Sequence, residues 1–386
     1  MNQKYAIPFN KPYMSGKELH YMSQAVLYGE IKGNSRFTHK VHHFFQEKYG
    51  FKKCLLTTSC TDALEMAALL LDIKEGDEVI MPSYTFVSTA NAFVLRGAKI
   101  VFADSLPNHP NMDVSKIEEL ITARTKAIVP VHYAGVACDM EVIMQLAGKY
   151  GLFVVEDAAQ AIDSYYKGRP LGSIGHLSAF SFHETKNIIS GEGGMLVVND
   201  DHFIERAEII WEKGTNRASF FRGEVDKYGW VDIGSSYLPS DIIAAFLYAQ
   251  VENLHDIQNR RKEIWNFYLQ ALTPLANRGV IKLPEKLDHT TNNYHMFYVI
   301  CRSIEDRSAI IKLLKENSIL AVFHYISLHK SPYYKNKHDG RDLVNSDYFT
   351  DRLLRLPFYY ELTEENLQKI TALLINCFQS KYETIS

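Results

Sequence analysis

Residues 152–160, LFVVEDAAQ, and residues 178–200, SAFSFHETKNIISGEGGMLVVND, decide the fold expected of this chain. The first segment is an apolar run that ends in two acids and small residues, as a buried strand does at the edge of a sheet. Upstream, from about residue 53, similar short apolar segments alternate with amphipathic segments that indicate helices. This alternation predicts an α/β fold with a mostly parallel central sheet flanked by helices. In such sheets, ligands bind at the carboxyl ends of the strands.

The expected elements follow this alternation. Strands are predicted at 53–58, 77–82, 98–104, 127–133 and 152–157, with helices at 61–71, 85–97, 114–122 and 140–151. After about residue 240 the pattern changes to one long helix, 241–272, followed by a strand at 292–302 and helices at 306–318 and 365–379. We therefore expect a large domain, residues 1–250, and a smaller C-terminal α+β domain, residues 251–386.

The composition is that of a globular protein. Of 386 residues, 46% are hydrophobic and 23% charged, and the formal net charge is -3. These values favour no nucleic-acid partner. No apolar run reaches the ~20 residues that cross a membrane, and the first residues lack the apolar stretch of a signal peptide. The five cysteines are odd in number and form no CxxC pair, so we expect a cytoplasmic protein without disulfides or a metal site.

Glu156 and Asp157 form the first candidate site. Successive side chains of a strand point to opposite faces, so only one of these acids can face a given ligand. An acid at this position could bind a metal, a ribose or a cationic heterocycle, or it could cap the next helix.

Lys186 is the second candidate, because it lies between an apolar segment and the glycine-rich turn 191–194. Such turns bring the backbone close to a bound group. An amine in a partly apolar pocket loses its proton more easily, as a Schiff-base lysine requires. A solvated loop lysine is the alternative.

Small polar residues between a predicted strand and a helix form the third candidate: Ser59, Cys60 and Thr61. Free N–H groups at a helix start bind phosphate. The alternative is an ordinary capped helix. Cys60 also has the position of a helix N-terminal thiol with a lowered pKa.

Pyridoxal 5'-phosphate (PLP) requires all three parts: a lysine for its aldehyde, a carboxylate for its pyridine nitrogen and donors for its phosphate. We assign these roles to Lys186, to Asp157 and to residues 59–61. An aromatic side chain over the ring would help, and Phe86 is the candidate. Phe86 could instead be a core residue, with Tyr84 as the next choice for stacking.

Motifs along nearly the whole chain resemble the sugar-nucleotide aminotransferases of the DegT/StrS type, which have the PLP-dependent transferase fold type I. The segments that carry the resemblance are IPFNKPY, TSCTDAL, PSYTFVSTANA, PVHYAG, EDAAQA, SFHETKN, GEGG, KGTNR, HYISLH and LRLPFYYELT. A Rossmann oxidoreductase is disfavoured, because residues 58–61 lack GxGxxG.

The resemblance implies a role for each matching residue. Lys186 would bond the cofactor and move the proton, and Asp157 would pair with the pyridinium. Gln160 would contact the ring hydroxyl side, and Ser181 would join Cys60 and Thr61 at the phosphate. His329 would lie near the mouth of the active site, where a plain surface histidine is the alternative. The resemblance also implies a homodimer with shared active sites.

Two positions depart from the family pattern. Relatives commonly have Gly where this chain has Cys60, and a backbone contact there tolerates Cys only with a negative φ. Relatives also have an Asn-Tyr-Arg run whose Asn reaches the partner's cofactor phosphate, whereas this chain has Gly234-Ser235-Ser236-Tyr237-Leu238. Ser236 can still donate one hydrogen bond there.

Within the family, residues 29–50, 181–194 and 231–241 are most similar to members that aminate C4 of dTDP-4-dehydro-6-deoxy-glucose with glutamate as donor. Other relatives have His in place of the lysine and dehydrate the sugar, which Lys186 argues against. A 3-keto-sugar aminotransferase and a regulatory PLP-binding protein on the same fold stay open as alternatives.

Overall fold

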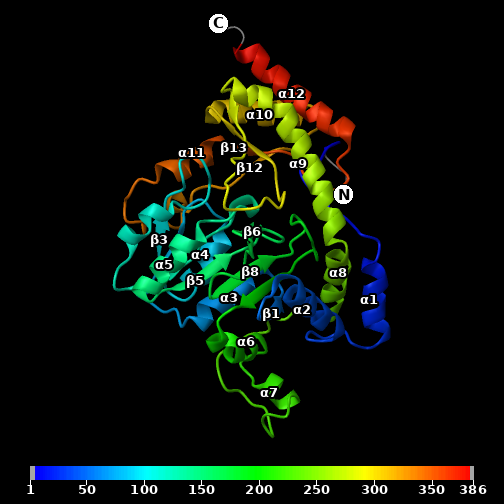
Figure 1. Ribbon diagram of the computed structural model, residues 1–386, viewed down its shortest axis with the longest axis vertical. Helices are drawn as coiled ribbons and strands as arrows, with labels where there is room; N and C mark the ends of the chain where they lie inside the picture. The colour runs from blue at the N-terminus through cyan, green and yellow to red at the C-terminus, as the bar shows by residue number, and fades with distance from the viewer. Residues whose placement is uncertain (1–4, 383–386) are drawn as a thin grey trace.

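The computed structural model describes residues 5–382, and its centre is a seven-stranded sheet with the order β1-β9-β8-β5-β4-β2-β3 (Figure 1). Neighbouring strands from β8 to β3 are parallel, and β9 alone runs antiparallel to both of its neighbours. The expected α/β fold with a mostly parallel sheet is confirmed. The strands are β1 (Lys53–Thr57), β2 (Glu78–Pro82), β3 (Lys99–Ala103), β4 (Thr125–Ile128), β5 (Phe153–Asp157), β8 (Leu177–Ser181) and β9 (Gly194–Val198).

Both faces of this sheet are buried, which explains the continuous apolar runs of its strands. Val154 packs in one hydrophobic cluster and its neighbour Val155 in another. The first cluster includes residues of α2, α5 and α8, and the second includes residues of α3, α4 and α6. The helices up to residue 252 are α1 (Glu18–Leu27), α2 (Arg36–Tyr49), α3 (Cys60–Leu70), α4 (Val87–Val94), α5 (Met140–Tyr150), α6 (Ile204–Trp211), α7 (Arg217–Phe221) and α8 (Asp241–Glu252).

A second sheet lies above the first in Figure 1 and is antiparallel, with the order β10-β11-β13-β12. Its core also takes in Ile7 from the start of the chain. A domain boundary at residue 250 stays a prediction. The elements here are α9 (Leu254–Asn277), β10 (Ile281–Lys282), β11 (Tyr298–Cys301), α10 (Ile304–Glu316), β12 (Val322–Phe323), α11 (Val344–Arg352), β13 (Leu353–Arg355) and α12 (Glu364–Tyr382).

Short elements complete the fold. They are the hairpin of β6 (Tyr165–Tyr166) and β7 (Arg169–Pro170) and the 3₁₀ turns η1 (Val114–Lys116), η2 (Glu118–Leu120), η3 (Tyr133–Gly135), η4 (Asp201–Phe203) and η5 (Leu328–Lys330). Across residues 5–382, no helix combines the length and the apolar character needed to span a bilayer.

Two expected helices are wrong. The helix predicted at 241–272 is two helices, because Asn253 leaves helical geometry and its side-chain amide donates to the Ala249 carbonyl at 2.9 Å. The helix predicted at 114–122 is η1 and η2. Asp113 accepts from the backbone and hydroxyl of Ser115, and such local side-chain bonds compete with a regular helix.

Candidate active site

A cavity of about 570 Å³ lies where β5 and β8 end and α3 begins. We call it the central cavity. It brings together most of the residues predicted from the sequence, which are Ser59, Cys60, Thr61, Phe86, Asp157, Gln160, Ser181 and Lys186.

Asp157 is the last residue of β5, and its carboxylate faces this cavity. Thr89 donates its hydroxyl to Asp157 Oδ2 at 2.7 Å, and the Ala159 N–H donates to Oδ1 at 3.2 Å. Burial raises the pKa of Asp157, against the opposing effect of these hydrogen bonds. A buried carboxylate of this kind is best satisfied by a cationic partner.

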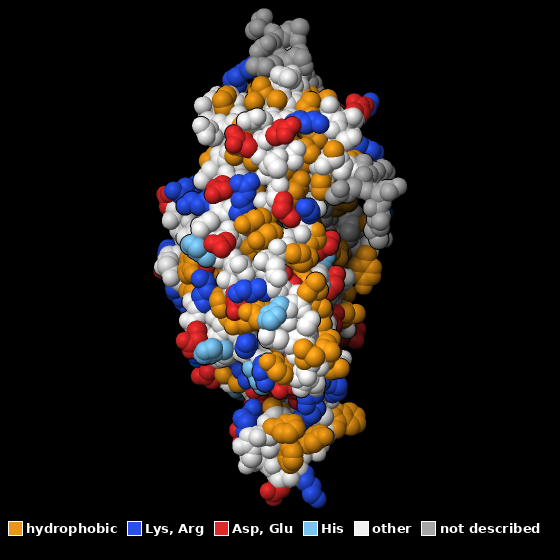
Figure 2. All heavy atoms as spheres, turned by 90° about the vertical axis from the view of Figure 1, so that its right-hand side faces the viewer, with side chains coloured by type: hydrophobic (Ala, Val, Ile, Leu, Met, Phe, Trp, Pro, Cys, Tyr) orange, Lys and Arg blue, Asp and Glu red, His pale blue; other side chains and the backbone are white. Residues whose placement is uncertain are grey.

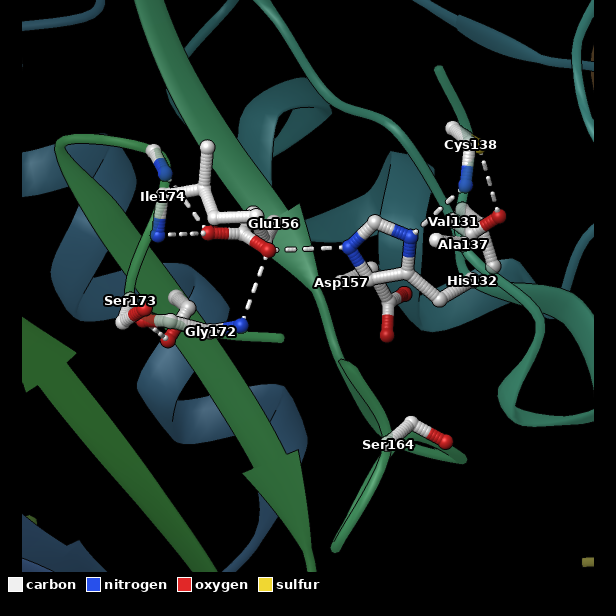
Figure 3. A network of polar contacts seen from close by, with 12 residues as sticks. Val131, His132, Ala137, Cys138, Glu156, Asp157, Ser164, Gly172, Ser173 and Ile174 are labelled. Carbon is white, nitrogen blue, oxygen red and sulfur yellow. Dashed lines mark hydrogen bonds and ion pairs between the residues drawn. The ribbon is translucent and has the colours of Figure 1, made fainter. Parts of the chain in front are cut away.

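Glu156 points the other way from Asp157, as strand alternation requires (Figure 3). It is fully buried and accepts a hydrogen bond from His132 Nε2 at 2.9 Å. Burial alone would raise its pKa, but hydrogen bonds from His132 and the backbone outweigh burial and lower the pKa. The backbone donors are the N–H groups of Gly172 at 2.8 Å, Ile174 at 2.8 Å and Gly175 at 2.6 Å.

The His132 ring has a fixed tautomer. The Cys138 N–H donates to His132 Nδ1 at 3.2 Å, so Nδ1 accepts and Nε2 carries the proton given to Glu156. Because His132 follows β4 and Glu156 lies in β5, this pair ties the two strand ends together beside Asp157.

Lys186 lies in the loop between β8 and β9 and faces the central cavity. Burial lowers the pKa of Lys186 to about 8, although the nearby charge of Asp157 opposes the change. A substantial fraction of the amine is therefore neutral near that pH, and the neutral amine is the form that attacks a carbonyl carbon. The next residue anchors the loop, because Asn187 Nδ2 donates to Gln258 at 2.7 Å and to the Asn293 carbonyl at 2.9 Å.

The turn from β1 into α3 presents unpaired backbone donors, because the first N–H groups of a helix have no partner within it. Ser59 caps the helix by accepting from the Asp62 N–H at 3.1 Å, and Thr58 donates to the Asp62 carboxylate. Thr61 donates its hydroxyl to Ser88 at 2.8 Å. The Asp62 charge is thus engaged beside its own helix start, and the N–H groups of Cys60 and Thr61 are left for an anion.

The glycine-rich segment lies directly against this turn. A Cβ atom on Gly194 would be only 2.3 Å from the backbone nitrogen of Cys60, so only glycine fits there. Cys60 has a negative φ, which is the condition under which cysteine can replace the glycine that relatives commonly have at this position. The lowered thiol pKa expected for Cys60 is wrong, since burial and the nearby Asp157 raise it well above the ordinary value.

Phe86 and Gln160 border the same cavity. The Phe86 side chain is 54% exposed, so it is not a core residue, and its ring centre is 6.1 Å from that of Tyr325. Gln160 accepts from the Ala134 N–H at 2.6 Å and donates to the Tyr325 hydroxyl at 3.1 Å. Tyr84, the other candidate for stacking, is buried in a hydrophobic cluster.

Ser236 and His329 do not line the central cavity within this chain. Ser236 borders a separate cavity of about 740 Å³, together with Lys32 and Arg217. His329 is only 5% exposed, and its Nδ1 is 2.7 Å from the Ser83 hydroxyl. The proposed roles of both residues stay predictions.

The central cavity also contains residues that sequence reasoning missed. Thr89 lies in the segment PSYTFVSTANA, but nothing in that segment indicates that Thr89 is the partner of Asp157. His324 and Tyr325 follow β12, and the Tyr133 hydroxyl is 2.9 Å from His324 Nδ1. His295 bonds Asn187 Oδ1 at 2.8 Å, and Arg355 ends β13. Four of these cavity residues come from the region of the second sheet: His295, His324, Tyr325 and Arg355.

Among residues 5–382, no group of three or more His, Cys, Asp or Glu side chains could hold a metal ion. The residues of the central cavity fit PLP. The cavity combines a buried carboxylate, a lysine of lowered pKa and a helix start with free N–H groups, held against a glycine that lets the backbone approach.

Comparisons with known proteins agree with this chemistry. The DegT/DnrJ/EryC1/StrS aminotransferase family matches residues 14–375. The chain is 34% identical to GDP-perosamine synthase of Escherichia coli O157:H7, covering 94% of this chain and 95% of that protein. It is 33% identical to the spore coat polysaccharide biosynthesis protein SpsC of Bacillus subtilis, covering 95% and 96%.

Solved structures share the fold. One is Spr1654 from Streptococcus pneumoniae, described as a sugar aminotransferase and solved in its PLP form, with a TM-score of 0.88, 25% identity and coverage of 97% and 99%. The chain therefore belongs to the DegT/DnrJ/EryC1/StrS aminotransferase family and is a PLP-dependent sugar aminotransferase.

Proposed function

We propose that this enzyme moves an amino group from glutamate to C4 of dTDP-4-dehydro-6-deoxy-glucose. The product would be dTDP-4-amino-4,6-dideoxygalactose, made in the cytoplasm for a surface polysaccharide of the enterobacterial common antigen type. The observation that carries the amino transfer is the joint position of Lys186 and Asp157 in the central cavity. The choice of sugar is supported by the similarity of residues 29–50, 181–194 and 231–241 to family members that use this sugar.

Each predicted residue would hold a different part of the cofactor. Asp157 would keep a proton on the pyridine nitrogen, and Lys186 would bond the aldehyde carbon. Ser59, Cys60, Thr61 and Ser181 would hold the phosphate. Phe86 would pack on the ring, and Gln160 would face the ring hydroxyl. When bound, PLP draws electrons away from the carbon that carries the amine.

Lys186 would also move the protons of the reaction. The neutral Lys186 Nζ would take the α-proton of glutamate as a general base. In the second half of the reaction Lys186 would deliver a proton to C4 of the sugar from one side, which fixes the configuration of the new amine. The pKa of about 8 supports this exchange, because both protonation states are accessible near neutral pH.

We further propose a homodimer in which Ser236 reaches the partner's cofactor phosphate. The support is an exposed apolar arm around α7, which extends from the lower end of the protein (Figure 1). Trp230 is 84% exposed and Phe221 68% exposed, with Tyr228, Val231 and Ile233 also on the surface. Figure 2 shows hydrophobic side chains gathered at this end. A patch of this kind is typical of a protein interface.

The test follows the visible absorption of the bound cofactor. Glutamate should bleach the band, and dTDP-4-dehydro-6-deoxy-glucose should restore it, with the aminated sugar identified by NMR. Lys186→Ala should show neither change, whereas Lys167→Ala, at an exposed lysine, should behave as the wild type. If glutamate bleaches the band but only a 3-keto sugar restores it, the proposed sugar is wrong. A cofactor band that responds neither to glutamate nor to a sugar nucleotide would favour a regulatory PLP-binding protein.

A further inference from the structure

Arg355 is the last residue of β13, and its backbone is held between Tyr298 of β11 and Val322 of β12. Its side chain lines the central cavity together with Lys186 and Asp157. The second sheet therefore contributes a cation to a site whose proposed cofactor residues all come from the first sheet and its loops.

The guanidinium of Arg355 has no polar partner among residues 5–382. Its Nε is buried without a hydrogen bond, and no acid forms an ion pair with it. The contact that it does make is with the ring of Phe9, whose centre is 4.6 Å from Arg355 Cζ. The Arg355 charge interacts with the hydroxyls of Tyr84, Tyr133 and Tyr325 and is close enough to Lys186 to help lower the pKa of that amine. An arginine stays protonated even when burial lowers its pKa, so an unpaired charge faces the cavity.

The other charged groups of the cavity already have partners. Asp157 and Lys186 are assigned to the cofactor, and the Glu192 side chain is 72% exposed and 3.7 Å from His183. His295 and His324 are neutral, because burial lowers the pKa of both rings well below the ordinary value. The proposed phosphate site lies at the start of α3, which packs against the first sheet. Arg355 is therefore the cation left for an anion other than the cofactor's.

We propose that Arg355 binds a carboxylate of the amino donor. A planar guanidinium can donate two parallel hydrogen bonds to a carboxylate, which fixes the orientation of the donor as well as its position. This inference rests on the proposed function, in which the donor is an amino acid.

The experiment measures each half of the reaction separately in the holoenzyme of Arg355→Gln. We expect the apparent dissociation constant for glutamate to rise by about 30-fold, since charge-assisted hydrogen bonds are the strong ones. The affinity for PLP and the rate of the pyridoxamine form with the sugar nucleotide should not change. Arg355→Lys should recover part of the loss. Lys369→Gln, at an exposed lysine of α12, is the control for removing a positive charge.

Two further ligands separate the possible sources of the carboxylate and supply a readout that needs no turnover. Glutarate, which has no amine, should bind the wild type in calorimetry and bind Arg355→Gln about 30-fold more weakly. L-Alanine carries only an α-carboxylate. An equal loss with alanine and glutamate assigns the α-carboxylate to Arg355, and a loss with glutamate alone assigns the side-chain carboxylate.

Unchanged glutamate and glutarate binding in Arg355→Gln would overturn the inference. A loss confined to the sugar half-reaction or to PLP affinity would also overturn it. If glutamate fails to bleach the wild-type band, the proposed amino donor is wrong, and the glutarate titration still decides whether Arg355 binds carboxylates.

Discussion

Thr89→Val tests how Asp157 is kept ready for the cofactor. Thr89 donates to Asp157 Oδ2 at 2.7 Å, and Thr85 Oγ1 lies 2.9 Å from Thr89 Oγ1. Valine keeps the branched shape of the side chain and removes the donor. A hydrogen bond to a charged group contributes about 1.5–3 kcal/mol, and about 1.4 kcal/mol corresponds to a tenfold change in an equilibrium constant. The dissociation constant for PLP should therefore rise by about 10- to 150-fold.

The pH dependence gives the sign of this effect. The Thr89 hydrogen bond lowers the pKa of Asp157, against burial, which raises it. Removing the bond raises the pKa of Asp157 further, so the carboxylate is protonated earlier as the pH falls. PLP binding should therefore be lost at a higher pH in Thr89→Val than in the wild type when the pH is lowered.

The assay is a titration of apoenzyme with PLP, followed by visible absorbance between about pH 5 and pH 9, a range that covers the raised pKa values of buried carboxyl groups. Thr89→Ser keeps the hydroxyl and should bind PLP nearly as the wild type does. Thr371→Val is the matched control, because that buried threonine donates only to helix carbonyls of α12. Equal PLP affinity and an equal pH profile in Thr89→Val and the wild type would refute the role given to this hydrogen bond.

Three further predictions follow from the same site. The rate at which apoenzyme binds PLP should rise with pH and level off near pH 8, because Lys186 loses its proton there. A rate that continues to rise up to about pH 10.4, as expected for an ordinary lysine, would contradict the lowered pKa. Glu156→Gln should lower the free energy of unfolding by about 3–5 kcal/mol in urea denaturation, because the amide NH₂ would face N–H donors. Since the folded state lowers the Glu156 pKa, this stabilisation is present above the ordinary glutamate pKa and is lost as the pH falls through the lowered value, so variant and wild type should converge in acid. Gly194→Ala should abolish PLP binding, since its Cβ would lie 2.3 Å from Cys60 N, whereas Gly148→Ala, where the new Cβ meets nothing within 4 Å, should bind PLP normally.

The parts of the fold and of the site that depend on local sequence pattern could be predicted from the sequence. Apolar runs marked the strands of the first sheet, and polar residues at their ends marked Asp157, Lys186 and the turn at residues 59–61. The carboxyl ends of parallel strands lie at the same edge of a sheet. The sequence pattern therefore predicts that these segments, which are far apart in the chain, form one site.

The residues missed depend on how distant segments pack. Arg355 and His295 face the cavity because the second sheet lies over the first, and no local motif encodes that packing. The break at Asn253 was missed for a related reason. An asparagine side chain that bonds the nearby backbone competes with a regular helix, and the sequence does not show that Asn253 bonds the Ala249 carbonyl.

The role of Lys186 is tested most simply by finding where the cofactor is attached. Holoenzyme would be reduced with borohydride, digested and analysed by mass spectrometry. We expect the peptide containing Lys186 to carry the reduced cofactor and no other lysine to carry it. Attachment to a different lysine, or a cofactor that washes away unreduced from the wild type, would contradict the assignment of Lys186 and with it the arrangement proposed for the central cavity.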